Sequence, residues 1–217
     1  MSRTKKAWLI SLSAFLILSI MWFMNKPQYE SIYNKKSVAL VEKGVNQIKQ
    51  NEKNVLDNKW VKENGVEITH LPHTSNPLEQ FTSKKGTIEY FFAVIEMKDI
   101  NLFISSFQEE VISADLFSDE ASDKYAVAEK LMKQISRNHS LKDVQYKSRK
   151  GILGTESNTV DLKLIYDDNY EAKITIDLEQ VKDQHDTESG HDSHSLYVIN
   201  TPASEMIKKI NQPDSKG

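Results

Sequence analysis

The most apolar segment of the chain outside its N-terminus, residues 87–111, repeats its hydrophobic positions at helical spacing. These positions are Ile88, Phe91, Phe92, Ile95, Leu102, Phe103 and Phe107. The repeat is interrupted at Lys98-Asp99 and then resumes. An aspartate at such a break can cap a new helix by accepting hydrogen bonds from its free N–H groups. The pattern therefore predicts two short helices with a bend at Asp99, each burying its aromatic side.

Helical spacing also predicts three further helices. The first covers residues 37–59, and its narrow stripe suits a stalk helix, a weak coiled-coil seam or a helix laid on the domain. Its apolar positions are Val38, Val41, Val45, Ile48 and Val55. The second covers 123–137 and carries Tyr125, Ala128, Leu131, Met132 and Ile135 on one side. The third starts at Thr201-Pro202, because proline suits the first turn of a helix. Between Val111 and Ser122 we expect a polar link with only a poor strand.

From residue 142 onward the apolar positions alternate with polar ones, which is typical of strands covered on one face. The pattern predicts strands over 144–152, 160–166, 170–178 and 196–199, the second and third joined by a turn at Asp168-Asn169. Asn64-Gly65 predicts a small hairpin over 60–69. Asn76-Pro77 resembles a helix start, and Gly86 is expected to separate it from the central segment. The predicted fold class is α+β, with a transmembrane helix followed by helices packed on a curved antiparallel sheet.

The N-terminal residues 7–24 form an apolar run long enough to span the hydrocarbon core of a bilayer. Arg3, Lys5 and Lys6 precede the run, so the positive-inside rule places the N-terminus in the cytoplasm. The alternative is a cleaved signal peptide, but the run exceeds the usual apolar region and lacks a small-x-small cleavage site. We therefore expect an uncleaved anchor with membrane lipid as its partner, and the rest of the chain outside the cytoplasm.

The predicted organisation has four parts. Residues 1–26 form a cytoplasmic tail and a transmembrane signal anchor. Residues 27–75 hold a linker over 27–36, the stalk helix and the small hairpin. Residues 76–211 form the extracytoplasmic α+β domain, and residues 212–217 a frayed tail.

Composition narrows the classes of function. Of the 28 basic residues four lie in the first 26 positions, which leaves 24 basic against 31 acidic residues beyond the anchor. This acidic balance argues against nucleic acid as the partner, because phosphate binding needs a basic face. The absence of cysteine excludes disulfides, thiol catalysis, cysteine-bound zinc and a lipidated N-terminal cysteine.

The central segment resembles the opening helices of the NTF2-like (cystatin-like α+β cone) superfamily. The residues that carry the resemblance are Tyr90-Phe91-Phe92-Ala93, Ile95, Lys98-Asp99, Leu102, Phe103, Phe107 and Glu110-Val111. The helix and strands that follow fit the same order, so the resemblance covers about residues 77–200. It implies a helix-covered cone that serves in enzymes, ligand binders or assembly modules. Membrane-anchored members in Gram-positive bacteria resemble subunits of conjugation or secretion channels, which implies protein partners in the envelope.

Enzymatic cones hold an ionisable residue inside an apolar pocket, where burial adjusts its pKa for acid–base work. No catalytic constellation is visible here. The alternation places the strand carboxylates Asp161, Glu171 and Asp177 on the polar face, and Glu89 and Glu96 fit the solvent side of the central segment. His139 follows a helix, where a solvated or capping role is expected. A concealed pocket acid stays the alternative.

The segment 183–194 holds three histidines, His185, His191 and His194, together with four acidic residues. Imidazole and carboxylate groups suit zinc or nickel, although a solvated loop or a pH sensor has the same composition. His70 and His73 form a weaker pair of the same kind. We expect no cofactor. The sequence shows no phosphate-binding glycine loop and no Gly-x-Ser-x-Gly nucleophile elbow. The basic residues over 142–150 are expected along a solvated strand edge.

The sequence therefore predicts a single-pass membrane protein whose extracytoplasmic domain is a non-catalytic binding or assembly module. Two alternatives remain. The first is a ligand-binding or enzymatic cone with its pocket under the sheet. The second is a metal-binding envelope protein that uses the 183–194 loop.

Overall fold

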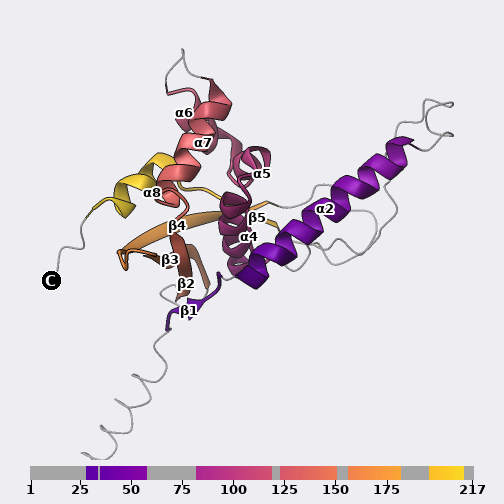
Figure 1. Ribbon diagram of the computed structural model, residues 1–217. Helices are drawn as coiled ribbons and strands as arrows, with labels where there is room; N and C mark the ends of the chain where they lie inside the picture. The colour runs from indigo at the N-terminus through magenta and orange to yellow at the C-terminus, as the bar shows by residue number, and fades with distance from the viewer. Residues whose placement is uncertain are drawn as a thin grey trace, which may run out of the picture.

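In the computed structural model, an antiparallel sheet has five strands that lie side by side in chain order (Figure 1). The structure describes residues 28–33, 35–57, 82–118, 123–150, 156–181 and 196–212. The strands are β1 (Glu30–Ser31), β2 (Leu141–Lys150), β3 (Glu156–Tyr166), β4 (Glu171–Val181) and β5 (Leu196–Ile199). Along β3 and β4 alternate side chains are buried, so one face of the sheet is covered and the other is polar.

The described helices pack on the apolar face and around the edge of this sheet (Figure 1). They are α2 (Lys35–Asp57), α4 (Lys84–Met97), α5 (Ile100–Ser105), α6 (Glu109–Leu116), α7 (Lys124–Ile135) and α8 (Ala203–Ile210). The α+β class and the strand-rich second half of the predicted fold are confirmed. The β5 bounds agree with the strand predicted over 196–199.

The bend predicted at Asp99 is confirmed. Helix α4 ends at Lys98, whose φ of 59° is left-handed and turns the chain. The Asp99 side chain then accepts a hydrogen bond from the Leu102 N–H at 3.1 Å, which starts α5. The expected boundary at Gly86 is wrong, because the hydroxyl of Ser83 caps α4 and accepts from the Gly86 N–H at 3.0 Å. Gly86 is therefore a buried residue of the first turn.

Because of the bend, Phe103 in α5 and Phe107 just after it pack against Phe91 of α4. The Phe91 ring lies 5.1 Å from Phe92, 5.7 Å from Phe103 and 5.4 Å from Phe107, measured between centroids. Phe103 and Phe107 are 5.2 Å apart. All four rings are buried. Aromatic pairs in edge-to-face or offset-stacked geometry at such distances stabilise the fold in addition to the stabilisation that comes from burying their surface. This cluster belongs to the same buried core as the apolar residues of the sheet.

The turn between β3 and β4 is also confirmed. Asn169 has a φ of 60°, and the Asp168 carboxylate accepts from the Tyr170 N–H at 3.0 Å. Asparagine and aspartate suit such a turn because they tolerate left-handed backbone and bond to it locally. At the end of β3, the buried Tyr166 hydroxyl donates to the Ile135 carbonyl at 2.9 Å, which ties the sheet to α7.

Three local predictions are corrected. The expected polar link after Val111 contains α6, which the Gln108 side chain caps by accepting from the Val111 N–H at 3.1 Å. Tyr125 is 57% exposed rather than on the buried side, because it lies in the first turn of α7, before the helix reaches the core. The expected linker over 27–36 contains β1, whose residues pair with Tyr146 and Gln145 of β2.

Of the three alternatives for α2, the first half of the helix supports the one in which it lies on the domain. Val41 and Val45 are buried, and the Lys49 Nζ lies 3.1 Å from the Asp99 carboxylate. Beyond this contact the helix runs away from the sheet (Figure 1). Leu40, on another side of the helix, is 42% exposed.

Several predictions fall outside the described residues. These are the anchor over 7–24, the hairpin over 60–69, the helix start at 76–79 and the loop over 183–194. Among the helices that the structure describes, none combines the length and the apolar character that crossing a membrane requires.

Candidate binding groove at the edge of the sheet

In the described part of the chain, no residue with a carboxylate, imidazole or amine is wholly buried between the helices and the sheet, although the half-buried His139 has one buried ring nitrogen. The buried polar side chains there, tyrosines aside, are hydroxyls of Ser37, Thr87, Ser106, Ser136 and Thr201. The aromatic cluster of Phe91, Phe92, Phe103 and Phe107 is part of this buried interior. Candidate sites must therefore be sought at the surface.

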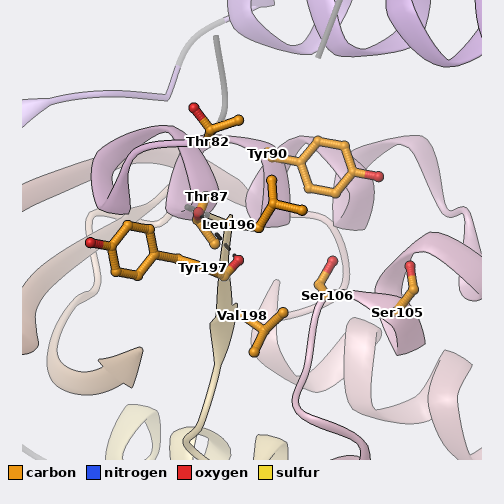
Figure 2. A pocket seen from close by; sticks show the side chains of 8 residues that line it. All are labelled: Thr82, Thr87, Tyr90, Ser105, Ser106, Leu196, Tyr197 and Val198. Atoms are coloured by element: carbon orange, nitrogen blue, oxygen red, sulfur yellow. Dashed lines mark hydrogen bonds between the residues drawn. The ribbon is translucent and has the colours of Figure 1, made fainter. Parts of the chain in front are cut away.

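A groove of about 240 Å³ lies where α4 and the end of α5 approach β5. It is lined by Thr82, Thr87, Tyr90, Ser105, Ser106, Leu196, Tyr197 and Val198, which we call the β5 groove. Figure 2 shows the side chains of Leu196 and Val198 on the same side of the strand as Tyr90 and the two serines, whereas the Tyr197 ring points to the other side. Most of the lining residues carry a hydroxyl group, and none carries a formal charge.

The backbone edge of β5 is only partly covered. The Ile199 N–H donates to the Ser106 carbonyl, and the Gln108 N–H donates to the Ile199 carbonyl, both at 2.9 Å. These bonds form a parallel bridge between Phe107 and Ile199. Since outward-facing backbone groups alternate along a strand, Tyr197 turns the same way as Ile199. Within the described segments, the Tyr197 N–H has no backbone partner.

Among the described residues, the extended segment beside β5 reaches Ile199 but not Tyr197, because the chain before it is helical. Residues 100–105 form α5, so only Ser106 to Gln108 extend along β5. The hydroxyls of Ser105 and Ser106 donate to the Leu102 carbonyl at 3.0 and 2.7 Å. Their oxygen atoms remain acceptors at the wall of the groove. The Tyr197 carbonyl accepts from the Thr87 hydroxyl at 3.5 Å, a long bond.

Tyr90 keeps its proton at physiological pH. Partial burial raises the pKa of its phenol, and the negative charge of Asp99 raises it further. A protonated phenol is both donor and acceptor. Together with the serine and threonine hydroxyls it makes the β5 groove a neutral, amphipathic surface. Such a surface can bind an uncharged group and hydrogen-bond its polar atoms, but it offers no acid or base to a reaction.

The other residues singled out in the sequence lie away from this groove. His139 is half-buried in the turn after α7, at a φ of 63°, and its backbone N–H donates to the Ser136 hydroxyl at 3.1 Å. The expected solvated or capping role does not account for its ring. The Nδ1 atom is buried and has no hydrogen-bond partner among the described residues. Burial lowers the pKa of His139, as does the nearby charge of Lys98.

The strand carboxylates lie on the polar face, as predicted. Arg149 pairs with Asp161 at 2.6 Å, and Lys163 pairs with Glu171 at 2.8 Å. The charge of the Arg149 guanidinium and its hydrogen bond lower the pKa of Asp161, although partial burial of the carboxylate acts in the opposite direction. Asp177 is exposed. Paired surface carboxylates of this kind hold the strands together and are not poised as bases.

The two glutamates of α4 also avoid the core, since Glu89 is half-buried and Glu96 is exposed. Of the basic residues over 142–150, Lys142 and Arg149 are exposed and Lys147 is half-buried. Among the described residues, β1 and Ile32 cover β2 only near Val144, Gln145 and Tyr146, so the remainder of β2 has no described strand on that side, which agrees with the expected basic strand edge.

The histidine clusters remain predictions. His185, His191 and His194 lie outside the described residues, as do His70 and His73. The part of the chain that the structure describes contains no cluster of three potential metal-ligating residues.

Sequence reasoning missed the β5 groove because its walls come from three separate stretches of chain. The alternation at 196–199 indicated a strand, but not which helix would lie beside it. Comparisons with protein families, with curated proteins and with solved structures find no match to this chain.

Proposed function

We propose that this protein is a single-pass, membrane-anchored extracytoplasmic protein whose α+β domain is a non-catalytic binding or assembly module in a cell-envelope complex. The observation that carries the proposal is the filled interior. Phe91, Phe103 and Phe107 pack against one another in the buried core, and no residue with a carboxylate, imidazole or amine is wholly buried among the described residues. With its interior filled by apolar side chains, the domain would bind its partners through its surface.

The anchor in this proposal is the apolar run over residues 7–24. Strand β1 begins at Glu30, so the domain would start within a few residues of the bilayer. The resemblance to NTF2-like subunits of conjugation or secretion channels supplies the type of complex by analogy with the fold alone. The remaining module would contact proteins, since its acidic balance disfavours nucleic acid.

A second candidate is the binding of a small uncharged ligand in the β5 groove. Its hydroxyl lining favours a molecule with an apolar body and a few hydrogen-bonding groups. However, its volume of about 240 Å³ lies below the roughly 300–1,000 Å³ of ordinary ligand pockets. The groove therefore suits one side chain of a protein partner better than a whole ligand.

The absence of cysteine makes the topology directly testable in the full-length chain. A single cysteine at Ser204, which is exposed on α8, is expected to react with a membrane-impermeant maleimide in intact cells. A matched cysteine at Ser2 is expected to react only after permeabilisation. The reverse pattern, or labelling of both sites in intact cells, would contradict the proposed orientation.

The assembly role is tested by chemical cross-linking of the full-length protein in its own membranes, followed by mass spectrometry of the adducts. The expected result is a small set of envelope proteins captured reproducibly. A chain that remains entirely monomeric at every cross-linker concentration would overturn the assembly role.

A further inference from the structure

We propose that the β5 groove binds an extended peptide of a partner protein, which adds to the outer edge of β5 at Tyr197 and places one uncharged side chain against Tyr90, Leu196 and Val198. This inference rests on the proposed assembly function and specifies the contact that it uses. Three independent features of the groove support it.

The first feature is continuity with pairing that already exists at this edge. Residues Ser106 to Gln108 bond to Ile199 through its N–H and its carbonyl. Two residues earlier the same edge turns the N–H and carbonyl of Tyr197 outward, and the carbonyl already accepts a long hydrogen bond from the Thr87 hydroxyl and has one further lone pair. One residue of an antiparallel peptide exchanges two hydrogen bonds with such a position. Strand addition of this kind is a recurring mode of peptide recognition, in which side-chain pockets provide specificity.

The second feature is the chemistry of the groove, which selects an uncharged side chain. Ser105 and Ser106 present hydroxyl oxygens, and no charged side chain lines the groove. A carboxylate or an ammonium group placed there would lose water without gaining a counter-charge, which is costly. The apolar walls formed by Leu196 and Val198 favour an aliphatic or aromatic side chain instead.

The third feature is the exposed apolar rim that continues from the groove. Leu196 is 48% exposed and pairs with Val181, which is 44% exposed. A strand edge that combines an unpaired N–H with exposed leucine and valine invites pairing with another chain. A peptide in the groove would cover both the backbone group and this rim.

An isolated peptide fits this edge better than a second copy of the chain. Thr87 of α4 lies against the Tyr197 carbonyl, and Ser106 to Gln108 cover the edge at Ile199. Two copies joined through their β5 edges would bring both sets of flanking elements into the same space. An extended segment free of such flanks can enter between them.

The test is site-specific photo-cross-linking of the full-length protein in its own membranes. A photoreactive phenylalanine analogue replaces Leu196 in one variant and Lys130, an exposed residue of α7, in the control. The expected result is an adduct of higher mass from position 196 only. Mass spectrometry should map it to an uncharged residue in a segment of another protein.

The contribution of the backbone is isolated by a second pair of variants. Tyr197→Pro removes the outward N–H, and an edge strand tolerates proline when its N–H faces away from the ladder. Tyr197→Ala removes the same ring but keeps the N–H. Tyr197→Pro is expected to lower the adduct yield about tenfold, as loss of one hydrogen bond implies, while Tyr197→Ala retains most of it. Equal melting temperatures of the two variants establish that both fold.

Other outcomes would overturn the inference. An adduct with twice the mass of the chain would indicate a second copy, and a cross-link within one chain would indicate that the protein covers its own edge. Equal yields from Tyr197→Pro and Tyr197→Ala would exclude strand addition. If general cross-linking still captures partners while position 196 does not, the inference fails and the proposed function survives. If no partner is captured by either method, both fail.

Discussion

Replacing Asp99 with alanine tests whether the bend between α4 and α5 depends on its cap. The Asp99 carboxylate makes two contacts, one to the Leu102 N–H and one to the Lys49 ammonium, both at 3.1 Å. Loss of an aspartate cap costs about 1 kcal/mol. The Lys49 side chain is 60% exposed, so solvent screens the ion pair and limits its contribution to roughly 0.2–1 kcal/mol. The expected loss for Asp99→Ala is therefore about 1.5 kcal/mol in the free energy of unfolding.

Two control variants separate the contacts. Asp99→Asn retains a capping oxygen and removes the charge, and Lys49→Gln removes the ion pair and retains the cap. Each should cost about 0.5 kcal/mol, and the double variant should cost no more than either alone. Urea denaturation followed by circular dichroism measures the four variants and the unmodified protein. If Asp99→Ala and Asp99→Asn lose the same free energy, the cap has no measurable role and the explanation of the bend is wrong.

The pH dependence supplies an independent check. Partial burial of Asp99 opposes ionisation, but the Leu102 N–H and Lys49 outweigh it and lower the pKa of the carboxylate. A carboxylate with a lowered pKa stabilises the fold above its unfolded pKa of about 3.9 and loses that contribution as the pH falls through the folded value. The stability difference between the protein and Asp99→Asn should therefore be constant near neutral pH and shrink below about pH 4. A difference that changes between pH 6 and 8 would contradict this assignment.

Three further predictions concern the core and the turn after α7. Phe103→Ala should lower the free energy of unfolding by about 3–5 kcal/mol in urea denaturation, because it opens a cavity in the aromatic cluster. The control, Phe117→Ala, changes a residue that is 54% exposed and should alter the free energy of unfolding by less than about 0.5 kcal/mol. Tyr166→Phe should cost about 1–3 kcal/mol by the same measurement, since it leaves the buried Ile135 carbonyl without its hydroxyl donor. Burial lowers the pKa of His139, so the unfolded chain binds its proton more readily and stability should fall as the pH drops from about 7 through 6.5. His139→Asn, which tolerates the same left-handed backbone, should reduce that fall in melting temperature between pH 7.5 and 5.5, and an unchanged profile would exclude His139 as its source.

The features that the sequence predicts correctly are those that depend on a few neighbouring residues. The Asp99 cap, the Asp168-Asn169 turn and the alternation of β3 and β4 each depend on contacts within a short stretch of chain. In β3 and β4 the buried face is the one that the alternation of apolar and polar residues predicts. For this reason the sequence alone predicts the bend and the strand-rich half of the fold.

The missed features depend on distant partners or on very short elements. Helix α6 buries only Ile112 and Leu116, too few positions to establish a helical period. Strand β1 has two residues, and its conformation follows from β2 and not from its own composition. The β5 groove needs α4 to cross beside β5, which no local pattern specifies. The Tyr197 N–H becomes a candidate contact only once the Ile199 pairing is known.

The place of β1 in the sheet has a consequence for the order of events during synthesis. Ser31 contacts Asp143 across a separation of 112 residues, although β2, β3 and β4 follow one another closely in the chain. At ribosomal rates of about 5–20 residues per second, the first strand waits roughly 6–20 s for its partner to emerge. Local hairpins close in microseconds, so the β2–β4 meander can form as soon as it is complete. The N-terminal strand can therefore dock only after β2 has emerged, long after its own synthesis.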